Sequence, residues 1–144
     1  MKRHEALAPL SREHHNTLML AQLLKKHAPE YKGLPVNNTD KARYALQQFE
    51  GIIKNHFQQE ENILEKVKDC HANIKSVSAE IIQEHRQLTA LFNSLNAATH
   101  VEDTMDKLAN LLQDHIRKEE RVLFPLLQEH CSEELLQQIY IDLH

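Results

Sequence analysis

A nine-residue phrase occurs twice in this chain and constrains what the segments around it can become. It reads HFQQEENIL at residues 56–64 and HIRKEERVL at residues 115–123. Both copies contain a histidine, a pair of glutamates that begins four residues later, a β-branched residue and a leucine. In an α-helix the histidine and the first glutamate lie on one face, about one turn apart. The phrase therefore predicts two helices that each present an imidazole beside a carboxylate.

The dipeptide Glu-His extends this duplication. It occurs at Glu13–His14 and at Glu84–His85, and each of these precedes one copy of the phrase. The first interval is longer because it contains a segment rich in proline, glycine and asparagine, residues 28–38. We read the chain as two related halves, and we find no array of short repeats.

Composition and periodicity predict an all-α protein. The 144 residues include two glycines and no tryptophan, a composition that favours helix and leaves few turns for a sheet. Apolar residues recur at spacings of three and four along four long segments. The expected helices run from Ser11 to about His27, from a cap at Asn38, Thr39 or Asp40 to Asp69–His71, from Asn73–Ser78 through Leu95, and from about Glu102 to Pro125, which kinks or ends the last of them.

Ser132 is expected to cap a short final helix, and residues 96–103 are expected to separate the third and fourth helices. Four long helices with short connections predict one domain, residues 1–144, folded as an antiparallel up-down-up-down four-helix bundle with a short C-terminal helix.

Six ionisable residues lie on the apolar stripes of these helices, where unpaired ionisable groups are costly. A metal ion would neutralise such a group of side chains. At a rise of about 1.5 Å per residue, an antiparallel bundle brings one histidine from each helix to the same level. We predict no catalytic side chain and no organic cofactor. The candidate metal ligands are His14, His56, Glu60, His85, His115 and Glu119.

Two adjacent histidines compete for the position in the first helix. His14 shares its stripe with Leu10, whereas the stripe through His15 passes Ser11 and Lys26. We choose His14 and keep His15 as the alternative. Four imidazoles and two carboxylates suit iron, manganese or zinc and disfavour calcium or magnesium. If both glutamates bridge two six-coordinate ions, positions stay open for a small ligand.

Several classes of protein are disfavoured. The net charge is −4 and no basic stripe is present, so nucleic acid and anionic membranes are not expected partners. No apolar run is long enough to span a bilayer, and none follows the first basic residues as in a secretory signal. Cys70 and Cys131 lack a CxxC arrangement and read as reduced structural cysteines. These features predict a cytoplasmic protein.

The stretches REHH, HFQQEENIL, QEH and HIRKEERVLFP resemble the haemerythrin-like, or HHE cation-binding, family over nearly the whole chain. The resemblance implies a non-haem di-iron centre in a four-helix bundle, with two iron ions and a bridging oxo or hydroxo group. It also implies binding or sensing of dioxygen or nitric oxide. The four histidines named above would be terminal iron ligands, and Glu60 and Glu119 would be the bridging carboxylates.

Thr89 departs from the oxygen-carrying members of the family, which have a second histidine at this position, four residues after that of the third helix. The departure favours relatives linked to nitric oxide, oxidative stress and repair of iron–sulfur clusters. Three interpretations stay open: a di-iron module that binds or senses a diatomic gas, a di-iron enzyme or iron donor in the stress response, and a structural-metal or metal-free bundle that acts through partners. The first ranks highest. The sequence leaves turnover open, and it leaves the oligomeric state open between a monomer and a homodimer.

Overall fold

The computed structural model describes residues 2–96 and 99–144, and no strand occurs within these two ranges. The predicted all-α class is confirmed. In chain order the helices are α1 (Ala8–Leu24), α2 (Asn38–Gln48), η1 (Phe49–Ile53), α3 (Lys54–Val67), α4 (Ala72–Ser94), α5 (Val101–Lys118), η2 (Glu119–Leu123), α6 (Phe124–His130) and α7 (Glu133–Leu143).

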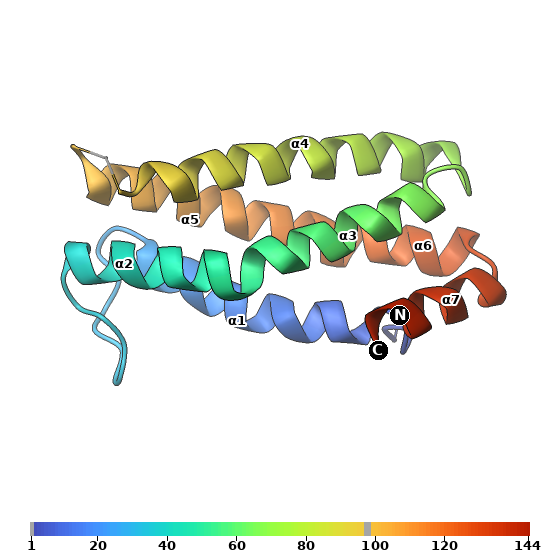
Figure 1. Cartoon of the computed structure of the whole chain (residues 1–144), viewed down its shortest axis with the longest axis horizontal. Helices are drawn as coiled ribbons and strands as arrows, with labels where there is room; N and C mark the ends of the chain where they lie inside the picture. The colour runs from blue at the N-terminus through green and yellow to red at the C-terminus, as the bar shows by residue number, and fades with distance from the viewer. Residues whose placement is uncertain (1, 97–98) are drawn as a thin grey trace.

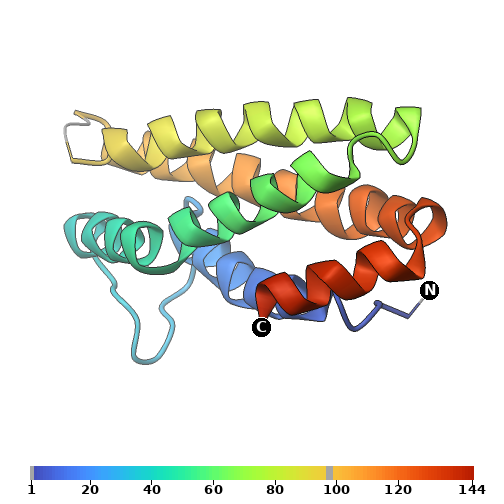
Figure 2. The same cartoon turned by 45° about the vertical axis from the view of Figure 1, so that its right-hand side comes forward.

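Four long arms extend along the molecule (Figure 1). The first arm is α1 and the third is α4, whereas the second joins α2, η1 and α3 and the fourth joins α5, η2 and α6. The short helix α7 lies beside the start of α1 (Figures 1 and 2). A four-helix bundle with a short C-terminal helix is compatible with these elements, and the antiparallel order of the helices stays a prediction.

The elements η1 and η2 are π-helical, whereas the sequence analysis expected uninterrupted α-helices. The buried residues supply a physical reason, because they recur every four positions through η1 at Ala45, Phe49, Ile53 and Phe57. In an α-helix of 3.6 residues per turn, such a series drifts by about 40° at each step. A wider π turn reduces the drift and keeps the series facing the core.

The first helix begins and ends three residues earlier than predicted. Pro9 stands in the first turn of α1, where the fixed φ of proline suits a helix start. Ser11 therefore lies inside the helix, and its hydroxyl donates a hydrogen bond to Glu120 at 2.9 Å. At the other end Lys25 is extended, and His27 has a φ of 61°, so α1 stops before the predicted end.

Two other helix starts also differ from their predicted caps. The side chain of Asn37, and not that of the three residues after it, accepts a hydrogen bond from the Asp40 N–H at 2.9 Å. At the start of α4, Nδ1 of His71 accepts from the N–H of Asn73 at 3.0 Å. Both caps lie just before the predicted region. The Ser132 cap is confirmed, because its Oγ accepts from a backbone N–H of α7 at 3.1 Å.

The sequence predicted that Pro125 kinks or ends this helix, and the fourth arm continues past Pro125 to His130, so an end at this proline is excluded. Pro125 stands in the first turn of α6, where the missing N–H of proline costs least. The predicted break at residues 96–103 includes 97–98, which lie outside the described residues, and α5 already begins at Val101. No helix in the described part of the chain is both long and apolar enough to cross a membrane.

The apolar core consists of two clusters that occupy different stretches of each arm. One cluster contains Leu20 and Phe57, and the other contains Leu10 and Ile63. Between the two, each arm carries one or two of the predicted metal ligands. The fold therefore places an ionisable layer between two apolar ones, and side chains in that layer are shielded from water on both sides.

Candidate metal centre

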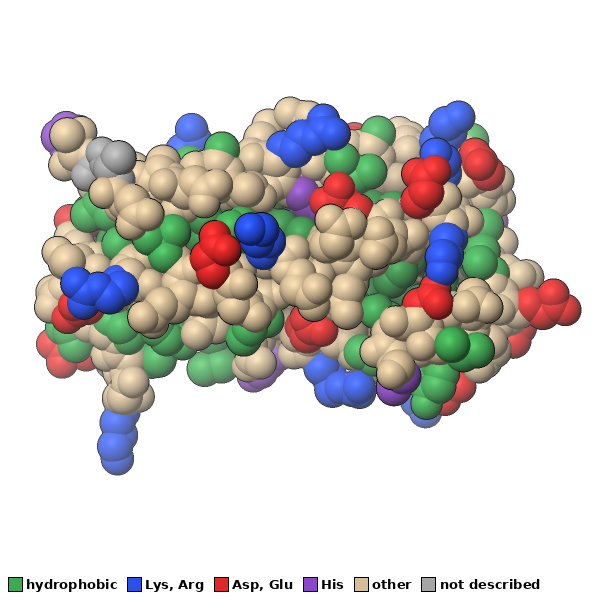
Figure 3. Space-filling model, in the orientation of Figure 1, with side chains coloured by type: hydrophobic (Ala, Val, Ile, Leu, Met, Phe, Trp, Pro, Cys, Tyr) green, Lys and Arg blue, Asp and Glu red, His purple; other side chains and the backbone are tan. Residues whose placement is uncertain are grey.

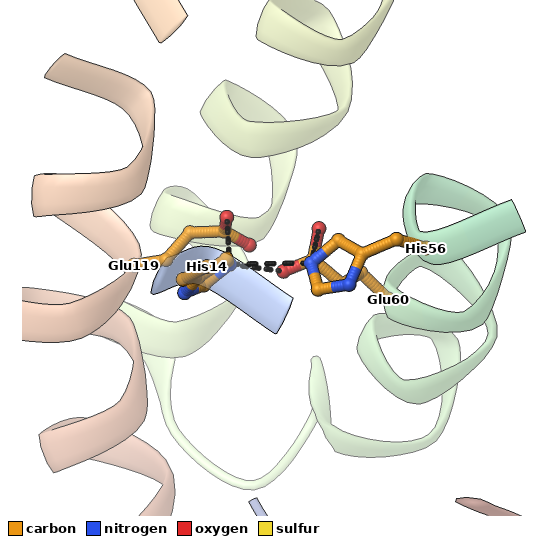
Figure 4. A group of neighbouring side chains, drawn as sticks. All are labelled: His14, His56, Glu60 and Glu119. Atoms are coloured by element: carbon orange, nitrogen blue, oxygen red, sulfur yellow. Dashed lines mark hydrogen bonds and ion pairs between the residues drawn. The ribbon is translucent and has the colours of Figure 1, made fainter. Parts of the chain in front are cut away.

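All six predicted ligands are buried, with at most 5% of any of them exposed. They form two groups in which the donor atoms lie within 4.8 Å of one another, and both groups contain Glu60 and Glu119. His14 and His56 complete the first group, which Figure 4 shows with its side chains pointing toward one another. The remaining two histidines complete the second group. The structure thus brings together two potential ion sites that share two carboxylates.

The four imidazoles turn Nε2 toward the shared carboxylates. His14 Nε2 lies 3.2 Å from Glu119 Oε1, and His56 Nε2 lies 3.4 Å from Glu60 Oε1. In the second group, His85 Nε2 lies 3.2 Å from the same Glu60 oxygen. His115 Nε2 lies 3.1 Å from the same Glu119 oxygen. Each glutamate therefore lies between one histidine of each group.

The chemistry of the layer fits bound metal ions. His14 Nε2 and His56 Nε2 are 3.2 Å apart, a close approach for two imidazole nitrogens. Both carboxylate oxygens of Glu119, Oε2 of Glu60 and Nε2 of His115 have no hydrogen-bond partner among the described residues. Buried polar atoms are normally satisfied. A pair of cations between these atoms would use all of them.

The two candidates for the first-helix position have different surroundings. His14 lies in the buried layer, where its ring stacks on Phe124 with centroids 5.7 Å apart. His15 is exposed and belongs to neither group of donor atoms. Of the two adjacent histidines, the geometry therefore presents only His14 to the predicted centre.

A second ring of carboxylates surrounds the first, and the sequence analysis missed it. Glu13 accepts a hydrogen bond from His56 Nδ1 at 2.8 Å, and Glu84 accepts one from His115 Nδ1 at 2.7 Å. These are the glutamates of the two Glu-His dipeptides. Each one precedes a ligand on its own helix and holds a ligand of another arm.

The second glutamate of each repeated phrase lies beside Nδ1 of one of the other two histidines, His85 and His14. Glu61 accepts from His85 Nδ1 at 3.1 Å, and Glu120 lies 3.7 Å from His14 Nδ1. Carboxylates on the outer nitrogen of a metal-bound histidine fix its tautomer and ring orientation. The sequence did contain a sign of these outer carboxylates. Each phrase has two consecutive glutamates, although one metal-ligand position requires only one of them.

The histidine of the first arm is held less closely than the other three. The Glu120 carboxylate also accepts from Ser11 at 2.9 Å and pairs with Arg3 at 3.5 Å. Arg3 donates to the backbone carbonyl of Glu120 at 2.8 Å and lies over the Phe124 ring. The N-terminal segment thus competes with His14 for its outer carboxylate.

Without metal, protons balance the buried carboxylates. Burial disfavours the charged form of His14, but contacts with Glu119, Glu120 and Glu60 together outweigh it and raise the pKa to about 12. Burial also lowers the pKa values of His56 and His115. The negative charge of Glu60 nevertheless raises the pKa of His56 to about 9, and that of Glu119 raises the pKa of His115 to about 10. Burial raises the pKa of Glu60, but the positive charge of His56 and contacts with Glu119 and His14 hold it well below its usual value.

A cavity of about 460 Å³ lies against the second group of ligands. His85 and Thr89, one turn apart on α4, form part of its wall. Its charged lining residues are Lys54, Arg86 and Glu61. Figure 3 shows histidine atoms reaching the surface between acidic and basic side chains on one face of the molecule. The short side chain of Thr89 leaves space on this side of the layer.

Comparison with known families agrees with this geometry. The sequence profile of the Hemerythrin HHE cation binding domain matches residues 5–127. The matched range includes all six predicted ligands and the four outer carboxylates. Searches of curated proteins and of solved structures returned no match. Since the match covers most of the sequence, the chain belongs to the Hemerythrin HHE cation-binding domain family.

Proposed function

We propose that this chain is a non-haem di-iron protein that binds or senses dioxygen or nitric oxide. The observation that supports it most is the sharing of Glu60 and Glu119 between two buried groups of donor atoms. In this proposal His14 and His56 hold one ion, and His85 and His115 hold the other. When bound, an iron pair supplies reversible coordination of a diatomic ligand and up to one electron from each ion.

The residues around the centre support this role in distinct ways. Glu13, Glu61 and Glu84 accept the Nδ1–H of three ligands, so their Nε2 atoms stay directed inward. The two apolar clusters exclude water from the layer. Four imidazoles with two carboxylates suit iron, manganese or zinc, and we place iron first because the haemerythrin family implies it. A cytoplasmic location and the oligomeric state stay predictions.

A second candidate is a di-iron enzyme or iron donor that acts in oxidative or nitrosative stress. The observation that favours it is the cavity beside His85, which is larger than a diatomic gas needs. Thr89 lies in its wall and provides no additional imidazole. Steady consumption of peroxide or nitric oxide by the iron-loaded protein would favour this candidate over simple binding.

Metal analysis and absorption spectroscopy of the aerobically purified protein test the proposal. We expect two irons per chain and near-ultraviolet bands of a ferric pair, whereas zinc gives no such bands. His14→Ala should lose paired-metal binding, and His15→Ala is the matched control because His15 is exposed next to it. Two irons per chain in the His14→Ala variant would contradict the ligand assignment. If removal of metal by a chelator leaves the stability of the protein unchanged, that result would instead support a metal-free role.

A further inference from the structure

The end of α3 meets the end of α6 at a pair of residues that the metal centre does not use. The chain reads Cys70-His71 just after α3 and His130-Cys131 at the end of α6, in mirrored order. The rings of His71 and His130 stack with centroids 3.8 Å apart and planes inclined by 19°. The two cysteines next to these histidines are both free.

Both thiols belong to the same apolar cluster. Cys131 is buried within it at 9% exposure, and Cys70, which is half-buried, packs against it. Burial raises the pKa of the Cys131 thiol to about 12, and contact with the Cys70 thiol adds to the increase. The stacked rings of the neighbouring His71 and His130 bring the two cysteine positions close together. Cys131 lies inside the cluster, and Cys70 lies at its edge with access to solvent.

The backbone at both cysteines is anchored to helix ends. The Cys70 N–H donates to the Val67 carbonyl at 2.9 Å, and the Cys131 N–H donates to the Leu127 carbonyl at 2.9 Å. His71, next to Cys70, caps α4. A disulfide requires Cα atoms about 4.4–6.8 Å apart and converging Cβ atoms. Cys70 and Cys131 are candidates for such a link, because they lie next to a pair of stacked rings and pack in one cluster.

We propose that Cys70 and Cys131 are a modification site for peroxides, which join them in a reversible disulfide. The sulfur of Cys70, the more accessible thiol, attacks one peroxide oxygen as the thiolate. The O–O bond breaks, Cys70 becomes a sulfenic acid, and the departing oxygen leaves as water or an alcohol after taking a proton. Cys131 then attacks the Cys70 sulfur, and the S–O bond breaks with release of water. Two thiols lose two electrons and one peroxide gains them.

The link would join the second arm of the bundle to the fourth. The closed loop would contain α4 and α5, together with His85, His115 and Glu119. A cross-link of this kind stabilises a protein mainly by restricting the unfolded chain. An added thiol reductant reverses the step by exchange and restores both thiols. The inference stands apart from the metal proposal, since neither sulfur is a predicted ligand.

Thiol counting and intact mass under added hydrogen peroxide test the site on the full chain. We expect titratable thiols to fall from two to none, with a loss of two hydrogens from the mass and an internal Cys70–Cys131 peptide after digestion. Dithiol reductant should restore both thiols. Two thiols that persist in excess peroxide would overturn the proposal. So would oxidation that yields only cross-linked dimers or sulfinic acids.

Single variants distinguish the thiol that attacks the peroxide, Cys70, from the thiol that closes the disulfide, Cys131. In Cys131→Ser, Cys70 should form a sulfenic acid that a 1,3-dione reagent traps. In Cys70→Ser, the buried Cys131 should stay reduced under the same treatment. The thermal midpoint should rise on oxidation in the unaltered chain and stay constant in both variants. Equal trapping at either cysteine would contradict the assignment of Cys70 as the attacking thiol.

Discussion

Glu84 on α4 accepts a 2.7 Å hydrogen bond from Nδ1 of His115 on α5, and the same carboxylate pairs with Lys118. The contact lowers the pKa of Glu84 despite partial burial of this side chain, so it is ionised at neutral pH. An ionised partner on the outer nitrogen raises the basicity of the inner one and fixes the ring. If His115 binds a metal ion as proposed, its strength as a ligand should depend on Glu84, which belongs to neither group of donor atoms.

Replacing this carboxylate should weaken metal binding without removing a ligand. Glu84→Gln keeps the size of the side chain and one oxygen acceptor but removes the charge. We expect metal affinity to fall by about 10–100-fold. Competition with a chelator of known affinity measures the change. Glu80→Gln is the matched control, because Glu80 is exposed and lies near Lys118 but has no contact with His115. An equal loss in both variants would show a general charge effect.

The outer carboxylate of His14 should matter less. Glu120 lies 3.7 Å from His14 Nδ1 and is shared with Ser11 and Arg3. Glu120→Gln should therefore reduce affinity by less than Glu84→Gln, and below about tenfold. The same chelator competition compares the two variants directly. A larger loss in Glu120→Gln would mean that the bound metal draws Glu120 closer to His14 than it lies here.

Metal uptake should release protons. His14, His56 and His115 have pKa values of about 12, about 9 and about 10, so all three are protonated at neutral pH when metal is absent. Binding through Nε2 requires the neutral imidazole, and each of the three must lose one proton. Affinity should fall as pH falls, because protons compete with metal. Titration of metal-free protein with ferrous iron in weak buffer, followed with a pH electrode, measures the release. Uptake with no acidification would contradict these protonation states.

An additional imidazole at the open side of the centre should change ligand binding. Thr89 lies one turn after His85 in the wall of the cavity. Thr89→His should place a donor beside the second ion site, and we expect weaker binding of azide, a small anionic probe, to the ferric protein. Spectral titration with azide measures the affinity. Ala90→His, which adds the same ring at an exposed neighbouring wall position, is the control. Unchanged azide affinity in Thr89→His would contradict the idea that Thr89 lies beside the position where a small ligand binds.

The periodic part of the architecture was accessible from sequence. Apolar spacings of three and four predict the helices, and ionisable residues on apolar stripes predict the six buried side chains, since burial without a partner is costly. The outer carboxylates escaped that logic because they are not fully buried, as at Glu13 and Glu84. In the sequence, a partly exposed glutamate looks the same as a solvated surface residue. Its histidine partner becomes apparent only when the neighbouring helix is placed beside it.

Other features depend on contacts that periodicity does not encode. The stacking of His71 on His130 requires the ends of two arms to meet, and the spacing along either arm carries no information about that. The cap at Asn37 lies one residue before the predicted choices, a difference within the usual uncertainty of helix ends. The π turns were missed because a period of four and a period of 3.6 are alike over one short segment.

The placement of the two π turns makes the related halves of the chain unequal. The first copy of the phrase is wound as α-helix throughout in α3, and η1 ends before it. The second copy changes winding inside itself, since η2 begins at Glu119. The extra residue of each π turn therefore lies upstream of the donor pair His56 and Glu60, but begins at the second donor of the pair His115 and Glu119. The repeated sequence is therefore not matched by a repeated backbone, and the two copies of the phrase hold their donors on differently wound helices.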